Sequence, residues 1–215
     1  MTNCFEDVIR VLNERMKGLT VTSLAIMARS RLRDERPAQN RKKSHLVMVS
    51  ARAGTKQQGL LRVGNLTVRC ALGKSSIGIL KREGDGKTPL AAMKVLFGFY
   101  RGDRWPVMSR APWLSPVHEN LGWCDAPYDQ NYNRAITRPY FASHETLIRD
   151  DGLYDCVIVL NWNMQPRANN RGSAIFMHVA RQGYRPTEGC IAVSKRDMMR
   201  LVKVLTPGMR VKTLA

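Results

Sequence analysis

Short runs of Val, Ile, Leu and aromatic residues, separated by Gly and Pro, recur along the chain from His45 onward. Such runs are typical of β-strands, whose pleated surface favours branched and aromatic side chains. Strands are predicted at residues 46–49, 60–63, 66–71, 154–162 and 174–179. Gly64-Asn65 lies between the second and third runs and predicts a tight hairpin. The pattern therefore favours a fold that is mainly β.

Apolar residues at helical spacing mark two further segments, one near each end of the chain. The N-terminal set predicts an amphipathic helix of about four turns; it consists of Phe5, Val8, Ile9, Leu12 and Met16. Ser194 to Asp197 has the form of a capping box, and the apolar residues that follow form one helix face; these are Met198, Leu201, Val202 and Leu205. Thr206-Pro207-Gly208 ends this helix, and residues 209–214 return as a last strand. The predicted class is α+β, mainly β with a few helices.

The domain organisation follows from where the polar residues gather. Residues 29–44 hold seven Lys or Arg and almost nothing apolar, which is typical of an exposed linker. We therefore divide the chain into an N-terminal helix with a basic linker, 1–44, and one folded domain, 45–215. Residues 98–151 are rich in aromatic residues, Asn, Asp and Pro, and so long an irregular stretch is expected to form a binding wall or lid.

The charge of the chain points to an anionic partner without choosing one. Thirty-five Lys and Arg against 17 Asp and Glu leave a net charge of +18. Nucleic acid, an acidic envelope polymer and a carboxylate-bearing substrate all fit that charge. Because the basic residues are spread along the chain rather than gathered in one module, nucleic acid is not the expected partner.

Location is predicted from cysteines and apolar runs. Five scattered cysteines without a C-x-x-C pair argue against a disulfide scaffold and favour a reducing compartment. No apolar run is long enough for a transmembrane helix. The cytoplasm is expected, and the periplasm only if translation starts at Met16 and Leu19 to Ala28 serves as an export signal.

The segment from Gly172 to Cys190 carries the strongest candidate chemistry. Alternation along the predicted strand places His178 on one face with Ala174 and Phe176. Gly189 before Cys190 allows a sharp turn with backbone amides directed at a substrate. A cysteine nucleophile needs a base to form its thiolate, and His178 is the nearby histidine. Spacing alone leaves open whether this pair is catalytic or whether both residues are structural.

Two other motifs fail on inspection. Gly86-Lys87-Thr88 is not a phosphate-binding loop, because position 81 is Lys instead of Gly and Pro89 follows. His144-Glu145 begins a zinc-protease motif, but position 148 is Ile. The remaining His and Cys residues lack ligand spacing, so neither a metal nor another cofactor is expected.

Three motifs in order resemble the L,D-transpeptidase catalytic-domain family. They are the strand-borne His178 with Thr187-Glu188-Gly189-Cys190, the segment Gly84 to Pro89 as G-x-x-x-T-P, and the C-terminal helix with its Pro-Gly turn and closing strand. Gly122 to Asp125 and Tyr132 to Arg134 resemble the middle of a compact branch of that family. The resemblance covers residues 45–215 and implies a β-sandwich or barrel catalytic domain with an extra N-terminal helix.

The resemblance implies acyl transfer on peptidoglycan stem peptides or muropeptides. In that family a cysteine attacks the carbonyl of a diamino acid, releases the terminal D-residue and passes the acyl group to an amine or to water. Carried onto this chain, Cys190 is the nucleophile, His178 the base and the Val179 carbonyl the group that orients it. The Gly189 and Cys190 amides form the oxyanion hole, and Thr187 takes the place of a frequent Ser in substrate binding.

Departures from the family pattern keep alternatives open. The arginine usual two places after the cysteine is Ala192, and Ala91 and Met93 replace a Gly and an aromatic residue. Arg181 or Arg185 is the expected replacement charge for substrate binding. The short loop before Cys190 suits a hydrolytic L,D-carboxypeptidase of muropeptide recycling as well as a transpeptidase. A non-enzymatic basic module that binds nucleic acid or cell-wall polymer is the alternative from another class, and the sequence leaves the oligomeric state undetermined.

Overall fold

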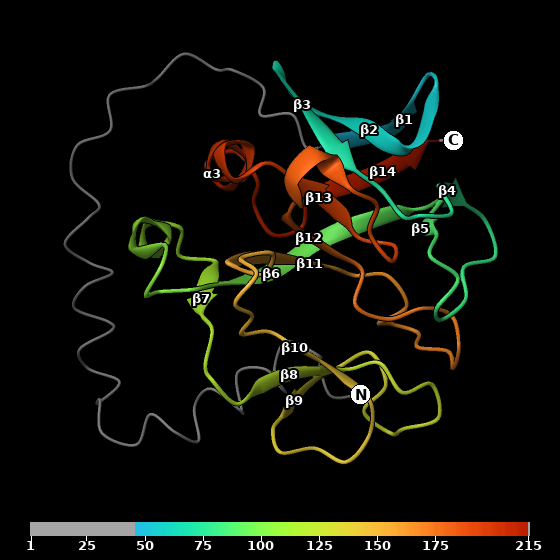
Figure 1. The fold of residues 1–215 in the computed structure, drawn as a ribbon, viewed down its shortest axis with the longest axis vertical. Coiled ribbons are helices and arrows are strands. Elements are labelled where there is room, and N and C mark those ends of the chain that lie inside the picture. The colour runs from blue at the N-terminus through green and yellow to red at the C-terminus, as the bar shows by residue number, and fades with distance from the viewer. Residues whose placement is uncertain (1–45, 215) are drawn as a thin grey trace. The chain divides into compact units, whose positions relative to one another are not determined.

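The computed structural model describes residues 46–214, which form one mainly β unit (Figure 1). Its largest sheet has nine strands in the order β11-β12-β13-β3-β2-β1-β14-β6-β7. The strands are β1 (Leu46–Arg52), β2 (Thr55–Val63), β3 (Leu66–Ala71), β6 (Ala92–Tyr100), β7 (Leu114–Pro116), β11 (Cys156–Leu160), β12 (Phe176–Val179), β13 (Ile191–Val193) and β14 (Arg210–Leu214). Because β11 also pairs with β6, the sheet closes on itself as a barrel.

Smaller elements complete the described chain. A three-stranded sheet, β10-β8-β9, lies below the large sheet in Figure 1. It contains β8 (Leu121–Cys124), β9 (Ala135–Thr137) and β10 (His144–Thr146). The short strands β4 (Ile77–Gly78) and β5 (Thr88–Pro89) pair in parallel. The helices are α3 (Lys195–Val202) and the 3-10 turns η1 (Pro106–Arg110) and η2 (Gln182–Tyr184).

Alternation along residues 174–179 divides their side chains between two apolar clusters. Ile175, Met177 and Val179 belong to the main core inside the closed sheet. Ala174 and Phe176 belong to a second cluster, which also contains Cys190. The predicted alternation is therefore confirmed, and β12 places His178 on the side of the second cluster, where its ring packs edge-on against Tyr154.

Several predicted elements are confirmed with small changes of length. Val63 pairs with Leu66 across the Gly64-Asn65 hairpin. Ser194 caps α3 by accepting a hydrogen bond from the Asp197 amide at 3.1 Å. Helix α3 ends at Val202, and Leu205 is buried in the turn that follows. The strand expected at 174–179 starts only at Phe176, because Ala174 has a positive φ of 50°.

Two features were not predicted. Strand β6 forms at Ala92–Tyr100 and pairs with both β14 and β11, so it completes the barrel. Residues 98–151, expected to be irregular, contain the small sheet β10-β8-β9. The predicted N-terminal helix and basic linker lie outside the described residues.

Candidate active site

A cavity of about 210 Å³ opens beside the second apolar cluster and contains the predicted cysteine and histidine. Cys190 follows the turn that leads into β13, and His178 lies on the neighbouring parallel strand β12. Both side chains line the cavity, together with Thr187, Arg181, Arg185 and Ala192. The topology therefore brings together residues that are separated by a loop in the sequence.

The turn before Cys190 is held by hydrogen bonds of Thr187. The Thr187 hydroxyl donates to the Cys190 carbonyl at 2.7 Å and accepts from the Gly189 amide at 3.2 Å. Its backbone pairs with the segment after β3: the Thr187 amide donates to Leu72 O at 2.9 Å, and Lys74 N donates to Thr187 O at 2.8 Å. These bonds anchor the nucleophile turn to the barrel wall.

Gly189 is required by both conformation and space. Its φ is +138°, and a Cβ at this position would lie 2.7 Å from the Lys87 carbonyl oxygen. That oxygen belongs to backbone, so it cannot move aside as the end of a flexible side chain would. The backbone thus passes the Gly84 to Pro89 segment at a distance that only glycine allows.

Gly189→Ala is expected to cost more stability than a comparable glycine substitution elsewhere, and to reduce activity about a hundredfold. A side chain at positive φ costs about 1–3 kcal/mol, and the overlap with Lys87 adds to that cost and displaces Cys190. Gly54→Ala is the matched control, because Gly54 has φ +81° and no atom within 4 Å of its Cβ position. Thermal unfolding and turnover of both variants check this, and equal losses would show that the Lys87 contact is unimportant.

The Cys190 thiol is neutral in the resting site. Its Sγ donates to the Ala174 carbonyl at 3.1 Å and accepts from the Phe176 amide at 3.4 Å. The residue is 9 % exposed. Burial, which disfavours the charged form, raises the pKa of the thiol to about 12. The sulfur therefore needs a base at the moment of attack.

The backbone holds the His178 imidazole in one tautomer. Its Nδ1 lies 2.8 Å from the Val179 carbonyl oxygen. Because a carbonyl only accepts, Nδ1 carries the proton and Nε2 keeps its lone pair. Burial lowers the pKa of the imidazole to about 4, and the Arg149 and Arg181 charges add to this effect. The ring is thus neutral near pH 7 and can accept a proton.

The thiol and the imidazole share the cavity without a direct bond in the resting state. Among residues 46–214 no hydrogen bond joins Cys190 Sγ to His178, because the thiol donates to Ala174 instead. Apo sites often show such loose catalytic contacts, which tighten when substrate binds.

A family model matches almost all of the described residues. Residues 44–212 match the YkuD family, whose description is L,D-transpeptidase catalytic domain. The chain belongs to this family. The resemblance drawn from the three motifs is thereby confirmed, and the mainly β barrel is the fold of an L,D-transpeptidase-type catalytic domain. No curated protein matches the chain.

Three solved structures are similar at low identity. L,D-transpeptidase 1 of Mycobacterium tuberculosis is 10 % identical with a TM-score of 0.35, over 79 % of this chain and 62 % of that one. An L,D-transpeptidase from Mycobacterium smegmatis is 13 % identical with a TM-score of 0.37, over 79 % and 58 %. Bd1075 of Bdellovibrio bacteriovorus is 13 % identical with a TM-score of 0.39, over 82 % and 50 %. The chain thus spans less than two thirds of each of these proteins.

The segment expected to form a wall contributes charged side chains to the site of this L,D-transpeptidase-type domain. Glu145 on β10 and Arg149 after it both line the cavity. The Tyr154 hydroxyl donates to Glu145 Oε2 at 3.1 Å, and burial raises the pKa of the Glu145 carboxyl. Arg149 pairs with Asp151 at 2.6 Å and stacks over the Tyr154 ring at 5.1 Å. A polar wall therefore faces the cysteine.

Sequence reasoning missed Lys81, Glu145 and Tyr154 as members of the site. Glu145 was considered only as part of a failed zinc motif, and Lys81 only as a residue that spoils a phosphate loop. The one available signal was their place within motif-bearing segments, since Lys81 precedes the G-x-x-x-T-P motif and Tyr154 opens a predicted strand. Contact with the cavity depends on how the barrel closes, which no local pattern encodes.

The described residues also bear on metals and membranes. Nowhere in residues 46–214 do three or more His, Cys, Asp or Glu side chains form a group that could hold a metal ion. No helix in that same range is long and apolar enough to cross a bilayer.

Proposed function

We propose that this domain is a cysteine acyltransferase that acts on peptidoglycan stem peptides, with Cys190 as nucleophile and His178 as base. The observation that carries the proposal is the shared cavity, which is lined by a neutral thiol just before β13 and by a neutral imidazole of fixed tautomer on the adjacent strand β12. The family match adds the reaction class.

The reaction proceeds by acylation of the cysteine. His178 Nε2 takes the thiol proton as Sγ attacks the carbonyl of the diamino acid in the stem peptide. The carbonyl oxygen gains negative charge, which the Cys190 amide stabilises. The Gly189 amide becomes a second donor once it releases its 3.2 Å bond to Thr187. Imidazolium then protonates the departing amine of the terminal D-residue, and a thioester remains on Cys190.

The second half-reaction transfers the acyl group. An acceptor amine or a water molecule loses a proton to His178 Nε2 as it attacks the thioester carbonyl. The thiolate leaves and is protonated again by the imidazolium. The Val179 carbonyl keeps the same tautomer of His178 ready for both halves, so no carboxylate is needed as a third member.

We infer that Arg181 or Arg185, which line the cavity together with Ala192, binds the substrate carboxylate. Ala192 lines the cavity where the family usually has arginine, and Arg181 and Arg185 line the same cavity. Arg185 lies in the loop that leads to Thr187, so its guanidinium is well placed to pair with a carboxylate of the stem peptide. Thr187 supports this binding through its hold on the nucleophile turn.

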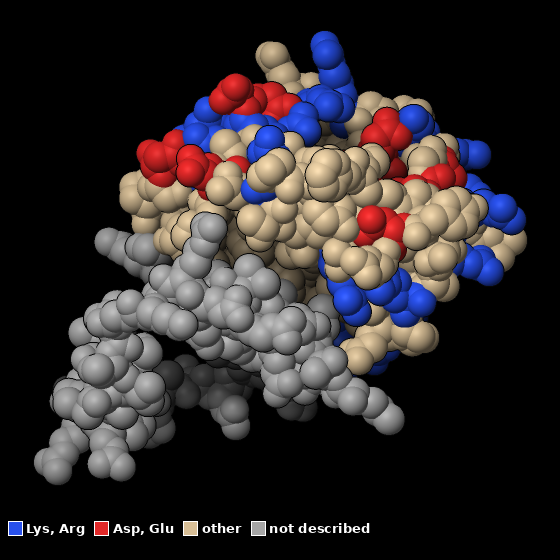
Figure 2. Space-filling model, turned by 90° about the horizontal axis from the view of Figure 1, so that it is seen from below, with Lys and Arg blue, Asp and Glu red and all other residues tan. Residues whose placement is uncertain are grey.

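Two alternatives are a hydrolytic carboxypeptidase, which differs only in the acceptor of the acyl group, and a binding module, which transfers no group. A hydrolytic L,D-carboxypeptidase forms the same thioester and gives it to water. A basic binding module needs a continuous basic surface instead. On the face drawn in Figure 2, Lys and Arg lie in separate groups with acidic side chains between them. Among the described residues, the face drawn there thus offers no continuous basic surface.

Incubation with a tetrapeptide stem, with and without an added D-amino acid, tests the proposal. We expect release of the terminal D-residue and a thioester adduct on Cys190 detectable by mass spectrometry. An exchanged tetrapeptide identifies a transpeptidase, and a tripeptide alone identifies a carboxypeptidase. Absence of both products and of the adduct under reducing conditions would overturn the proposal.

A further inference from the structure

Lys81 is a buried lysine that the proposed reaction does not yet use. The residue is 3 % exposed and lines the cavity that contains Cys190. Its aliphatic stem passes between two glycines: Cε lies 2.9 Å from a Cβ position on Gly172 and 3.5 Å from one on Gly189. Lys81 thus lies directly beside the nucleophile turn.

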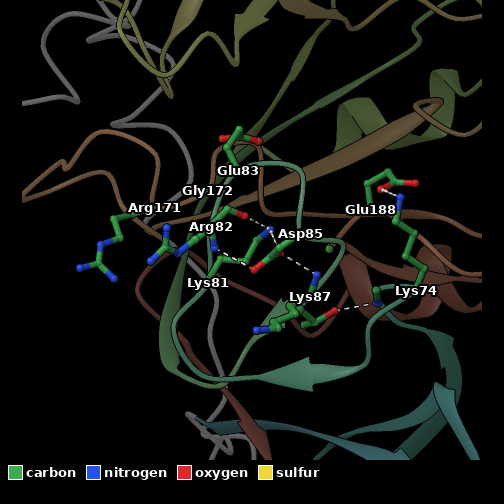
Figure 3. Close-up of polar contacts among 12 residues, drawn as sticks. Lys74, Lys81, Arg82, Glu83, Asp85, Lys87, Arg171, Gly172 and Glu188 are labelled. Carbon is green, nitrogen blue, oxygen red and sulfur yellow. Dashed lines mark hydrogen bonds and ion pairs between the residues drawn. The ribbon is translucent and has the colours of Figure 1, made fainter.

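A single partner network holds the ammonium group in place. Lys81 Nζ donates to Asp85 Oδ1 at 2.6 Å and to the Arg82 carbonyl at 2.9 Å, as Figure 3 shows for the pair with Asp85. The Asp85 carboxylate also accepts from the Arg82 amide at 2.8 Å and the Lys87 amide at 2.9 Å. Burial alone would raise the pKa of Asp85, but these hydrogen bonds lower it. The carboxylate stays charged and fixes the cation.

Burying a charged lysine costs free energy unless its ammonium group is paired and hydrogen-bonded, and among the described residues Lys81 has acceptors for only two of its donors. An ammonium group has three donors, and two of them are satisfied by Asp85 and Arg82. Asp85 does not line the cavity, whereas Lys81 does. Of the two paired residues, only Lys81 therefore borders the cavity, while the Asp85 carboxylate bonds to Lys81 and to the loop amides of Arg82 and Lys87.

The acidic side chains around Cys190 disfavour a negative sulfur. Glu145 from β10 and Glu188 from the nucleophile turn both disfavour the thiolate, and the Lys81 charge favours it. Glu188 is neutralised in part by Lys74 at 2.7 Å, as Figure 3 also shows. Tyr154 and His178, which also surround the site, are neutral near pH 7. Arg149, Arg181 and Arg185 also line the cavity, but Lys81 is the buried cation whose stem lies beside Gly189, where it can compensate developing negative charge.

We propose that Lys81 is a positioning residue of the cysteine site, whose fixed charge favours the thiolate and the acyl oxyanion as they form. The inference rests on the proposed function, since it assumes that Cys190 is the nucleophile. The Lys81–Asp85 pair would then have an electrostatic role at Cys190 as well as a structural role in anchoring the loop. A loop anchor and an electrostatic group predict different responses to removal of each charge.

The test compares Lys81→Met, Asp85→Asn and the double variant by the rate at which iodoacetamide alkylates Cys190, read by peptide mass spectrometry at neutral and mildly alkaline pH. Lys81→Met should slow alkylation about tenfold, because loss of an adjacent cation raises the thiol pKa by about one unit. Asp85→Asn should leave the rate equal to or above that of the wild type, because it removes the negative partner only. The double variant, which leaves no unpaired charge, should be slower than Asp85→Asn.

Controls separate this inference from folding and from the proposed function. Lys94→Met is the matched control, because Lys94 is exposed on β6 and does not line the cavity. A parallel loss of rate in Lys81→Met and Asp85→Asn, or an unchanged rate in Lys81→Met, would show that the pair is only a loop anchor. If wild-type Cys190 forms no thioester adduct with a tetrapeptide stem, the proposed function fails and the inference fails with it. If it reacts normally and Lys81→Met has no effect, the inference alone fails.

Discussion

Cys190→Ser should reduce release of the terminal D-residue from a tetrapeptide stem by at least about a thousandfold and abolish the covalent adduct. A serine hydroxyl is a far weaker acid than a thiol, and a single imidazole in a site arranged for sulfur activates it poorly. The fold should survive, since the change replaces one buried atom and keeps a donor for the Ala174 carbonyl.

Cys156→Ala is the matched control for this experiment. Cys156 is a fully buried cysteine on β11 whose thiol pKa is also raised by burial, to about 12, but it does not line the cavity. Its replacement should cost some stability through a small void and leave turnover nearly unchanged. Full activity of Cys190→Ser would remove the nucleophile assignment, whatever the behaviour of the control.

His178→Gln should lower turnover about a hundredfold to ten-thousandfold, the usual contribution of a general base. In the wild type the neutral imidazole is the active form, so activity should fall as the pH drops through about 4, instead of near the ordinary histidine value of about 6.5. The physical cause is burial, which penalises the imidazolium. The variant should lose this acid limb, because the group that titrates is gone.

A pH profile of turnover for both proteins, with His144→Gln beside them, provides the measurement. His144 is a fair match, since its Nδ1 also lies 2.8 Å from a backbone carbonyl, that of Ala142, but it does not line the cavity. His144→Gln should keep both the rate and the acid limb. An acid limb that persists unchanged in His178→Gln would assign the titrating base to another residue.

The parts of this protein that could be predicted from sequence are those encoded by neighbouring residues. The hairpin at Gly64-Asn65 and the cap at Ser194 depend on local backbone preferences and local hydrogen bonds. The two-sided burial of residues 174–179 follows from the period of two in a strand. The Gly189-Cys190 turn was also visible, because only glycine tolerates a φ of +138° next to another segment.

Other features could not be predicted, because they depend on pairing between strands that are far apart in the sequence. Strand β6 was missed, although it joins β14 to β11 and closes the barrel, because its partners lie far along the chain. A wall from residues 98–151 was predicted, but the place of Glu145 in it was missed for the same reason, since Glu145 lies on β10 of the small sheet, which pairs with β8. Pairing between distant strands places these residues, and a local sequence pattern cannot predict such pairing.

The sequence by itself therefore determined the strand-rich class and the family, and it predicted Cys190 and His178 as the reacting pair, because each of these is written in short motifs. Only the tertiary structure decided the chemical state of that pair. Burial beside the second apolar cluster makes the Cys190 thiol and the His178 imidazole neutral, and the fold also places Lys81 beside Gly189. Protonation depends on the solvent and charges around a group, and those are properties of the assembled fold.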